Sequence, residues 1–264
     1  MSKQKTKEEL KVHKEEVLDK ISTYIDKLIA SNNNKIQNKA DKFSYWLKDY
    51  ITFLDFETEF KADKMRKYKR GEILKVHLGY NIGSEEGGLH YCVVLDKENS
   101  LYSPVVTIVP LTSVKPWTDI NKLHKGEVYL GNDLFTNLVS KINLCNENID
   151  NDLAKLEINV ETLKDTQAKY EKTRFIELVN EFSNKIEAIK KSQQLIKQMK
   201  KEVLKMKTGS IALTNQITTI SKIRIYDPKK NEDVLSNIKL SNEKLDLLDE
   251  QIGINYTNLM KNVK

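Results

Sequence analysis

The sequence predicts an α+β protein in which a small, many-turned β module is combined with long helices. Seven of the nine glycines and three of the four prolines fall between Gly71 and Gly131. Residues 1–70 and 132–208 contain neither glycine nor proline. Glycine permits positive φ angles and proline favours turns, so chain reversals are expected to concentrate between Gly71 and Gly131. The two regions without these residues can form long helices.

Two amphipathic helices are predicted for the first 66 residues. Apolar residues recur at three- and four-residue spacing between Leu10 and Leu28, and a second stripe of the same kind runs from Ile36 to Leu54. This spacing places apolar side chains on one face of a helix. The polar run of residues 31–34 separates the stripes, so residues 1–66 are predicted to form a helical hairpin.

The β module is predicted to combine segments that lie far apart in the sequence. Residues 71–78, 91–95, 104–111, 127–130 and 210–217 are short runs rich in strand-forming residues. The last run lies about eighty residues beyond the others, so a small β-barrel would comprise residues 67–132 together with 208–264. A C-terminal helix is expected to follow, with Ser241 as its N-cap and Leu259 near its end.

Residues 133–207 are predicted to form an inserted antiparallel coiled-coil arm. A heptad-like stripe of apolar residues begins at Leu134 and continues to Val203. One straight helix of this length would carry the chain roughly 110 Å from the barrel, and residue 210 must return to it. The polar stretch Lys164–Lys172 is therefore the expected reversal. We interpret the stripe as the core of this hairpin rather than as a seam for a partner.

The charge distribution and the composition indicate which partners and which location to expect for this protein. The net charge is +6, and the segment Lys61–Arg70 carries six basic residues against one acidic residue. This segment is either a solvated helix end or an electrostatic guide for a polyanion. The sequence opens with neither a signal peptide nor an apolar run of the ~20 residues that a membrane helix needs, so a cytoplasmic protein without membrane contact is expected.

Cysteine and histidine patterns predict neither a disulfide framework nor a metal site. Cys92 lies in a predicted strand and Cys145 at an apolar helix position, so both are interpreted as buried, reduced thiols. The four histidines and two cysteines lack the spacing of metal ligands. No metal or other cofactor is therefore expected.

Four short motifs resemble the MazF/PemK family, whose members are toxins of toxin-antitoxin modules. They are Arg70-Gly71-Glu72-Ile73, the string from Gly83 to His90 (GSEEGGLH), the run from Ser103-Pro104 to Thr112, and the run from Leu213 to Ile220. The resemblance covers residues 69–131 and 209 to about 255. It implies an SH3-like barrel that can form a homodimer. It also implies a metal-independent endoribonuclease that cuts single-stranded RNA at short sequences and is silenced by a cognate antitoxin.

The resemblance also assigns roles to individual residues. The family's catalytic threonine falls on Thr112. The candidate RNA-binding residues in the motifs are Ser84, Glu85, Gly87, Gly88 and Gln216. The sequence departs from the family at one important place: His90 stands where the family usually has a catalytic arginine, and Tyr91 replaces the usual proline beside it.

The chemistry of RNA cleavage indicates what His90 can do. Cleavage without a metal needs a base for the 2′-OH proton, an acid for the leaving 5′ oxygen, and donors for the charged phosphorane. A histidine side chain can hold or release a proton near neutral pH, whereas an arginine stays protonated. His90 is therefore the candidate acid/base, and Thr112 would hydrogen-bond to the scissile phosphate. Lys67, Arg70 and Lys115 are candidates for the missing positive charge.

Three other readings remain open at this stage. His90 could be an ordinary structural residue beside a glycine turn. The barrel could be a catalytically inactive module that binds RNA, an antitoxin or a topoisomerase, because related toxins with this fold poison gyrase. The helical arms could themselves bind an antitoxin or a second copy of the chain.

Overall fold

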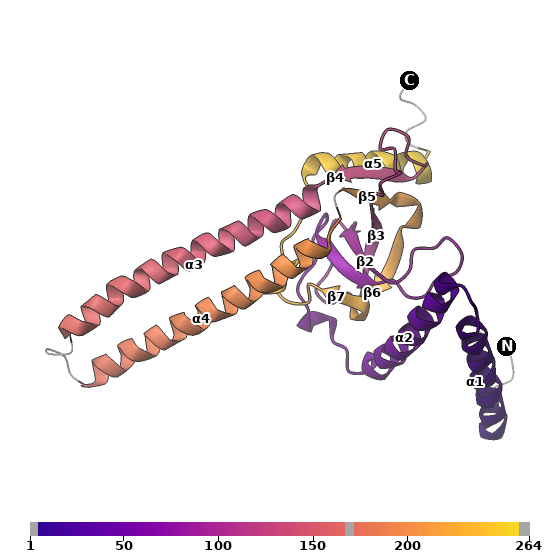
Figure 1. Ribbon diagram of the computed structural model, residues 1–264, viewed down its shortest axis with the longest axis horizontal. Helices are drawn as coiled ribbons and strands as arrows, with labels where there is room; N and C mark the ends of the chain where they lie inside the picture. Colours follow the sequence, from indigo (N-terminus) through magenta and orange to yellow (C-terminus); the bar gives the residue numbers. More distant parts are fainter. Residues whose placement is uncertain (1–4, 167–171, 208, 259–264) are drawn as a thin grey trace. The chain divides into compact units, whose positions relative to one another are not determined.

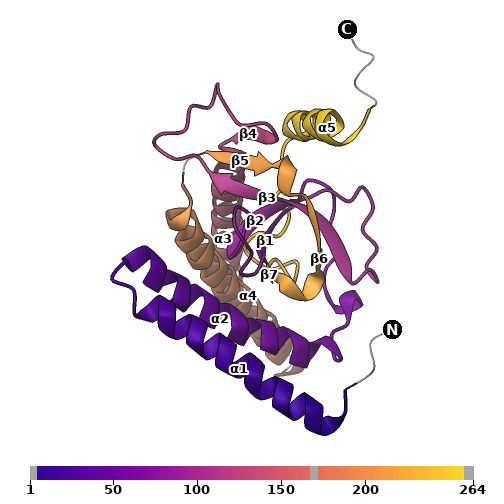
Figure 2. The same ribbon diagram turned by 90° about the vertical axis from the view of Figure 1, so that its right-hand side faces the viewer.

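The computed structural model describes residues 5–166, 172–207 and 209–258, and it shows the mixture of helices and antiparallel strands that the sequence predicts (Figures 1 and 2). The chain divides into two compact units. The first consists of Met1–Phe60 and Leu78–Leu89, and the second of Lys61–His77 and His90–Lys264. The division into a hairpin, a barrel and a separate arm stays a prediction.

Two antiparallel helices, α1 (Lys7–Ile29) and α2 (Asn34–Glu57), make up most of the first unit, as predicted. A reciprocal capping box starts α1: the Thr6 side chain accepts from the Glu9 amide, and the Glu9 carboxylate accepts from the Thr6 amide. The Asn33 side chain caps α2. A Phe43 ring on α2 meets Tyr24 of α1 edge-on at 5.4 Å between ring centroids, which holds the pair together.

The second unit contains an antiparallel sheet of seven strands among the described residues. They are β1 (Ile73–His77), β2 (Leu89–Val94, whose first residue belongs to the first unit), β3 (Val105–Ser113), β4 (Glu127–Gly131), β5 (Ser210–Leu213), β6 (Thr218–Ser221) and β7 (Ile225–Asp227). The order is β4-β5-β3-β2-β1-β7, with β6 also paired to β3. The sheet therefore joins sequence-distant segments, as predicted, while its closure into a barrel stays a prediction.

One predicted strand was too long and two strands were not predicted. Residues 210–217 were expected to be extended, yet β5 ends at Leu213 and a 3-10 turn, η2 (Thr214–Gln216), follows. The reason is local: both the amide and the hydroxyl of buried Thr214 donate to the Gly126 carbonyl, at 2.7 and 2.9 Å, which draws the chain out of the ladder. The chain then re-enters the sheet as β6 and β7.

The insert forms two long antiparallel helices, α3 (Asp133–Thr166) and α4 (Lys172–Lys205), that lie side by side (Figure 1). The predicted reversal at Lys164–Lys172 falls largely on residues 167–171, which lie outside the described residues. Coiled-coil packing stays a prediction. Near the sheet, Leu138 and Met199 are fully buried in the same apolar core as Val93 and Val109.

The last helix, α5 (Asn242–Tyr256), begins as predicted: the Ser241 side chain accepts from the Lys244 amide. The Ser241 hydroxyl also donates to the Asp133 carboxylate at 3.0 Å, which links the starts of α5 and α3. Leu259, expected near the end of this helix, lies outside the described residues. Cys92 is buried, Cys145 is half-buried, and neither forms a disulfide.

Candidate active site

His90 and Thr112 lie on neighbouring strands of the sheet. Cys92 of β2 pairs with Pro110 of β3. Two residues before Cys92, the His90 ring contacts the Leu111 carbonyl of β3, and Thr112 is the next residue along that strand. Both His90 and Thr112 are half-buried. The structure thus places His90 in contact with the residue that directly precedes Thr112.

A backbone contact orients the His90 ring. Its Nδ1 lies 3.1 Å from the Leu111 carbonyl oxygen. A carbonyl only accepts hydrogen bonds, so Nδ1 carries the proton in this contact. In the neutral imidazole the second nitrogen, Nε2, is then the basic one. The strand next to His90 therefore selects the tautomer that a general base requires.

The end of β3 adds a positive charge next to Thr112. Thr112 pairs with Ile211 of β5, which holds its backbone in the sheet. The Lys115 amide donates to Thr118 Oγ1 at 3.1 Å, and the Lys115 ammonium donates to Ser113 Oγ at 3.3 Å. These contacts fold the residues after β3 back on themselves and keep the Lys115 charge near the strand end.

Sequence reasoning missed Trp117. Its side chain is 82% exposed in the loop between β3 and β4, five residues beyond Thr112. A large exposed aromatic ring costs solvation free energy, and in a lysine-containing loop it provides a face on which a nucleic-acid base can stack. The signal was present in the sequence: Trp117 follows Lys115-Pro116 and precedes Lys122 and Lys125.

Other predicted charge donors take part in the fold. Arg70 donates to the Leu95 carbonyl and pairs with the Asp249 carboxylate on α5. Lys67 is exposed, and Gln216 is half-buried in η2, which packs against β3 and β4. Contact of Lys67, Arg70 and Gln216 with RNA stays a prediction.

The basic segment Lys61–Arg70 is not a solvated helix end, so that reading was wrong. It forms a short 3-10 turn, η1 (Ala62–Lys64), and then a loop. The Arg66 side chain is only 6% exposed and pairs with the 5% exposed Glu72 carboxylate at 2.7 Å. The Glu72 carboxylate therefore neutralises one of the segment's charges inside the fold. Tyr68, two residues after Arg66, is fully buried.

The glycine turn belongs to the first unit and is closed by its own backbone. The Gly88 amide donates to the Gly79 carbonyl at 2.6 Å, and Glu85 Oε2 accepts from the Ile82 amide at 3.3 Å. A Cβ at Gly87 would lie 2.8 Å from the Gly79 oxygen, and Gly88 has a φ of 87°. The two glycines are therefore required by the turn itself. Contact of Ser84, Glu85, Gly87 and Gly88 with RNA stays a prediction.

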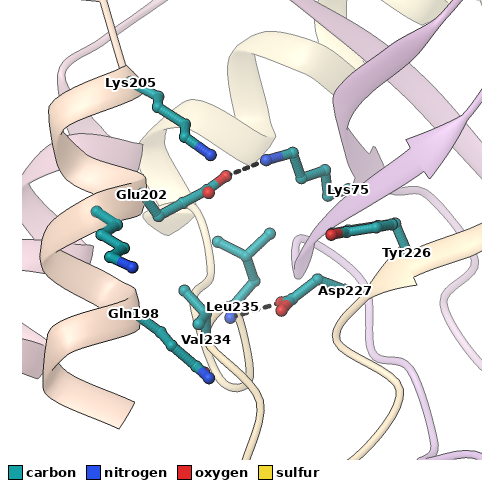
Figure 3. A pocket seen from close by; sticks show the side chains of 9 residues that line it. Lys75, Gln198, Glu202, Lys205, Tyr226, Asp227, Val234 and Leu235 are labelled. Carbon is teal, nitrogen blue, oxygen red and sulfur yellow. Dashed lines mark hydrogen bonds and ion pairs between the residues drawn. The ribbon is translucent and has the colours of Figure 1, made fainter. Parts of the chain in front are cut away.

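A second polar cluster lies on β1 and β7 where α4 meets the sheet (Figure 3). It surrounds a cavity of about 300 Å³. Glu202 of α4 accepts hydrogen bonds from the Lys75 ammonium and, at 2.5 Å, from the Tyr91 hydroxyl. Burial alone would raise the pKa of Glu202, but these two bonds outweigh it and hold that pKa below its usual range. Burial raises the pKa of Asp227 on the opposite wall.

Comparison with known proteins supports the interpretation of the sheet. Residues 69–144 match the model of the family described as PemK-like, MazF-like toxins of type II toxin-antitoxin systems. A comparison with curated proteins gave no match. Within the described residues, no helix is long and apolar enough to cross a membrane, and no group of three or more His, Cys, Asp or Glu side chains is arranged to hold a metal ion.

Proposed function

We propose that this protein is the toxin of a type II toxin-antitoxin module, because residues 69–144 match the model of the PemK-like, MazF-like toxin family. Its activity is that of a metal-independent endoribonuclease that cleaves single-stranded RNA at short sequences. The single observation that carries the proposal is the contact of the His90 ring with the Leu111 carbonyl of β3, directly before Thr112 on the same strand. A cognate antitoxin is its expected partner, and a homodimer is compatible with the family.

The proposed reaction is a transesterification at the scissile phosphate. His90 Nε2 takes the proton from the 2′-OH, whose oxygen then attacks phosphorus. The bond from phosphorus to the 5′ oxygen breaks, and that oxygen takes up a proton, so the products are a 2′,3′-cyclic phosphate and a 5′-OH. The Thr112 hydroxyl donates to a phosphate oxygen, and Lys115 stabilises the extra negative charge of the phosphorane.

Base binding is assigned to the loop after β3. The exposed Trp117 ring can stack on a nucleotide next to the scissile phosphate, and the lysines around it can contact the RNA backbone. Stacking tolerates any base, so this loop contributes affinity rather than sequence choice. Binding by lysines also makes cleavage sensitive to salt.

The test is an analysis of RNA ends after incubation with the purified protein in the presence of EDTA. Wild type is expected to produce 2′,3′-cyclic phosphate and 5′-OH ends. His90→Ala is expected to slow cleavage by about 10²–10⁴-fold, the usual contribution of a positioned base. Thr112→Ala should also slow it, and His13→Ala, at an exposed position of helix α1, is the matched control. Full activity in both site variants would refute this site.

A second candidate function follows from the replacement of the family's arginine by His90. In that case the sheet binds RNA or a protein partner and does not cleave. Expression of the wild-type chain separates the two functions. Growth arrest with fragmented RNA supports the nuclease, whereas growth arrest with intact RNA supports the binding module.

A further inference from the structure

Strand β2 connects the candidate active site with the inserted arm. Successive side chains of a strand project to opposite faces, so His90 and Tyr91 point in opposite directions. His90 contacts the Leu111 carbonyl of β3. Tyr91 instead reaches α4, where its hydroxyl donates to Glu202 at 2.5 Å. One short strand segment is thus held from both sides.

Glu202 is the centre of the contacts on the arm side. The Lys75 ammonium of β1 pairs with the same carboxylate oxygen that accepts from Tyr91 (Figure 3 shows Lys75 and Glu202 facing one another). Lys75 and Glu202 are each 14% exposed, and the Lys75 nitrogen lies 5.3 Å from the centre of the Tyr91 ring. A charge-assisted bond in a mostly dehydrated place is stronger than the same bond on the surface.

The connection depends on two features that the resemblance marks as unusual. Tyr91 stands where the family usually has proline, which has no side chain able to donate a hydrogen bond. Glu202 lies in the insert between β4 and β5 rather than in the sheet. Glu202 also lies outside residues 69–144, which match the family model, and it meets Tyr91 directly next to His90.

We infer that Glu202 is a positioning residue for His90. By anchoring Tyr91 and Lys75 it holds the start of β2 in place, so that His90 Nδ1 stays on the Leu111 carbonyl and Nε2 keeps its orientation toward the substrate. The inserted arm thereby supports the catalytic strand. This inference rests on the proposed nuclease function only for its effect on rate, because its effect on the His90 ring can be measured without RNA.

The experiment compares full-length wild type with Glu202→Ala, Glu202→Gln and Tyr91→Phe. NMR of ¹⁵N-labelled imidazoles reports the tautomer of each histidine, and His90→Ala identifies the His90 signals. Wild type should show His90 with the proton on Nδ1. Glu202→Ala and Tyr91→Phe should show a mixture of tautomers, and Glu202→Gln should lie between them and wild type, since its amide oxygen can still accept from Tyr91.

Glu187→Gln is the matched control on the same helix. Its carboxylate pairs with Lys191 at 2.9 Å on an exposed face of α4 and is 65% exposed. It should leave the His90 signals unchanged. Circular dichroism and thermal unfolding check that each variant is folded, and Glu202→Gln and Tyr91→Phe serve if Glu202→Ala is not.

Kinetics provide the second measurement. Misplacement of a catalytic group lowers kcat more than it changes KM, so Glu202→Ala should lose about tenfold or more in kcat with KM nearly constant. Unchanged His90 signals in folded Glu202 and Tyr91 variants would overturn the inference, as would equal changes in the Glu187 control. If wild type cleaves no RNA, the proposed function fails, while the NMR result still decides whether Glu202 positions His90.

Discussion

The two helical pairs of this protein share one kind of apolar periodicity but differ greatly in burial. In the pair α1/α2 the buried residues among those described are Leu28 and Ala40, while Leu10, Val17 and Leu18 are exposed. The pair α3/α4 contributes many residues to the apolar core: Leu134, Leu138, Ile142, Ile149, Leu156, Ile189, Ile196 and Met199. A periodic stripe therefore predicts a helix face, but the partner that covers it determines its energetic value.

The same contrast bears on function. The root of α3/α4 shares a core with the strands that carry the candidate active site, and Glu202 extends this contact to Tyr91. The pair α1/α2 exposes a large part of its apolar surface, including Tyr45, Tyr50 and Phe56. The arm is therefore part of the core of its unit, whereas the described residues of the α1/α2 hairpin bury few apolar side chains.

Substitution of apolar residues should give the largest difference in stability between the two helical pairs. Leu138→Ala removes a fully buried side chain at the root of α3 and is expected to cost about 2–5 kcal/mol in the free energy of unfolding. Leu18→Ala, at a 51% exposed site of α1, should stay within about 0.5 kcal/mol of wild type. Urea denaturation followed by circular dichroism measures both. Similar losses at the two sites would show that the pairs are equally important for stability.

A second, smaller effect is the pH dependence of stability that Asp227 causes where the arm meets the sheet. Burial raises the pKa of Asp227 above its ordinary value of 3.8, so the folded protein binds this proton more tightly than the unfolded chain does. Stability attributable to Asp227 therefore falls as pH rises from about 4 through the raised pKa. Asp227→Asn keeps an acceptor for the Leu235 amide, which now donates at 2.7 Å, but removes the titration.

The measurement is the unfolding free energy of wild type and Asp227→Asn across this pH range. The variant should gain relative to wild type as pH rises. Asp19→Asn, on the exposed helix α1, controls for the change in net charge. Parallel curves for wild type and Asp227→Asn would contradict the assignment of a buried, costly carboxylate beside Glu202.

Removal of a helix cap should change stability the least, and it tests whether α5 and α1 differ in their coupling to the core. Ser241→Ala removes both the cap of α5 and the bond to Asp133, and should lower the global unfolding free energy by about 1 kcal/mol. Thr6→Ala breaks the capping box of α1 at an exposed site. It should speed amide hydrogen exchange in the first turn of α1 without changing global unfolding. A global loss from Thr6→Ala would show that α1 is coupled to a larger core.

Much of the fold was predictable because local rules act strongly in this chain. The spacing of apolar residues located four long helices, and Asn33 and Ser241 mark helix starts by the chemistry of their side chains. The strands β6 and β7 were missed because they are short and lack a clear alternating pattern. The end of β5 was missed because it depends on Thr214 meeting Gly126, a contact across eighty-eight positions of sequence.

The sequence was enough to name the residues of the candidate site but not to predict what surrounds them. His90 and Thr112 were named from motifs, and their placement on paired strands agrees with that choice. Trp117 was overlooked although Lys115-Pro116 precedes it and Lys122 and Lys125 follow it, because a tryptophan is usually assigned to the core. The buried pair of Arg66 and Glu72 was overlooked because a basic run is usually solvated.

By itself the sequence determined where the long helices form and which residues are candidates for the chemistry, because backbone propensity and side-chain reactivity are local properties. Only the tertiary structure decided which helix faces are covered, that Arg70 is bound by Leu95 and Asp249, and that Glu202 of the arm reaches Tyr91. The contacts of Arg70 with Asp249 and of Tyr91 with Glu202 join segments more than one hundred residues apart, and a contact of that kind leaves no periodic trace in the chain.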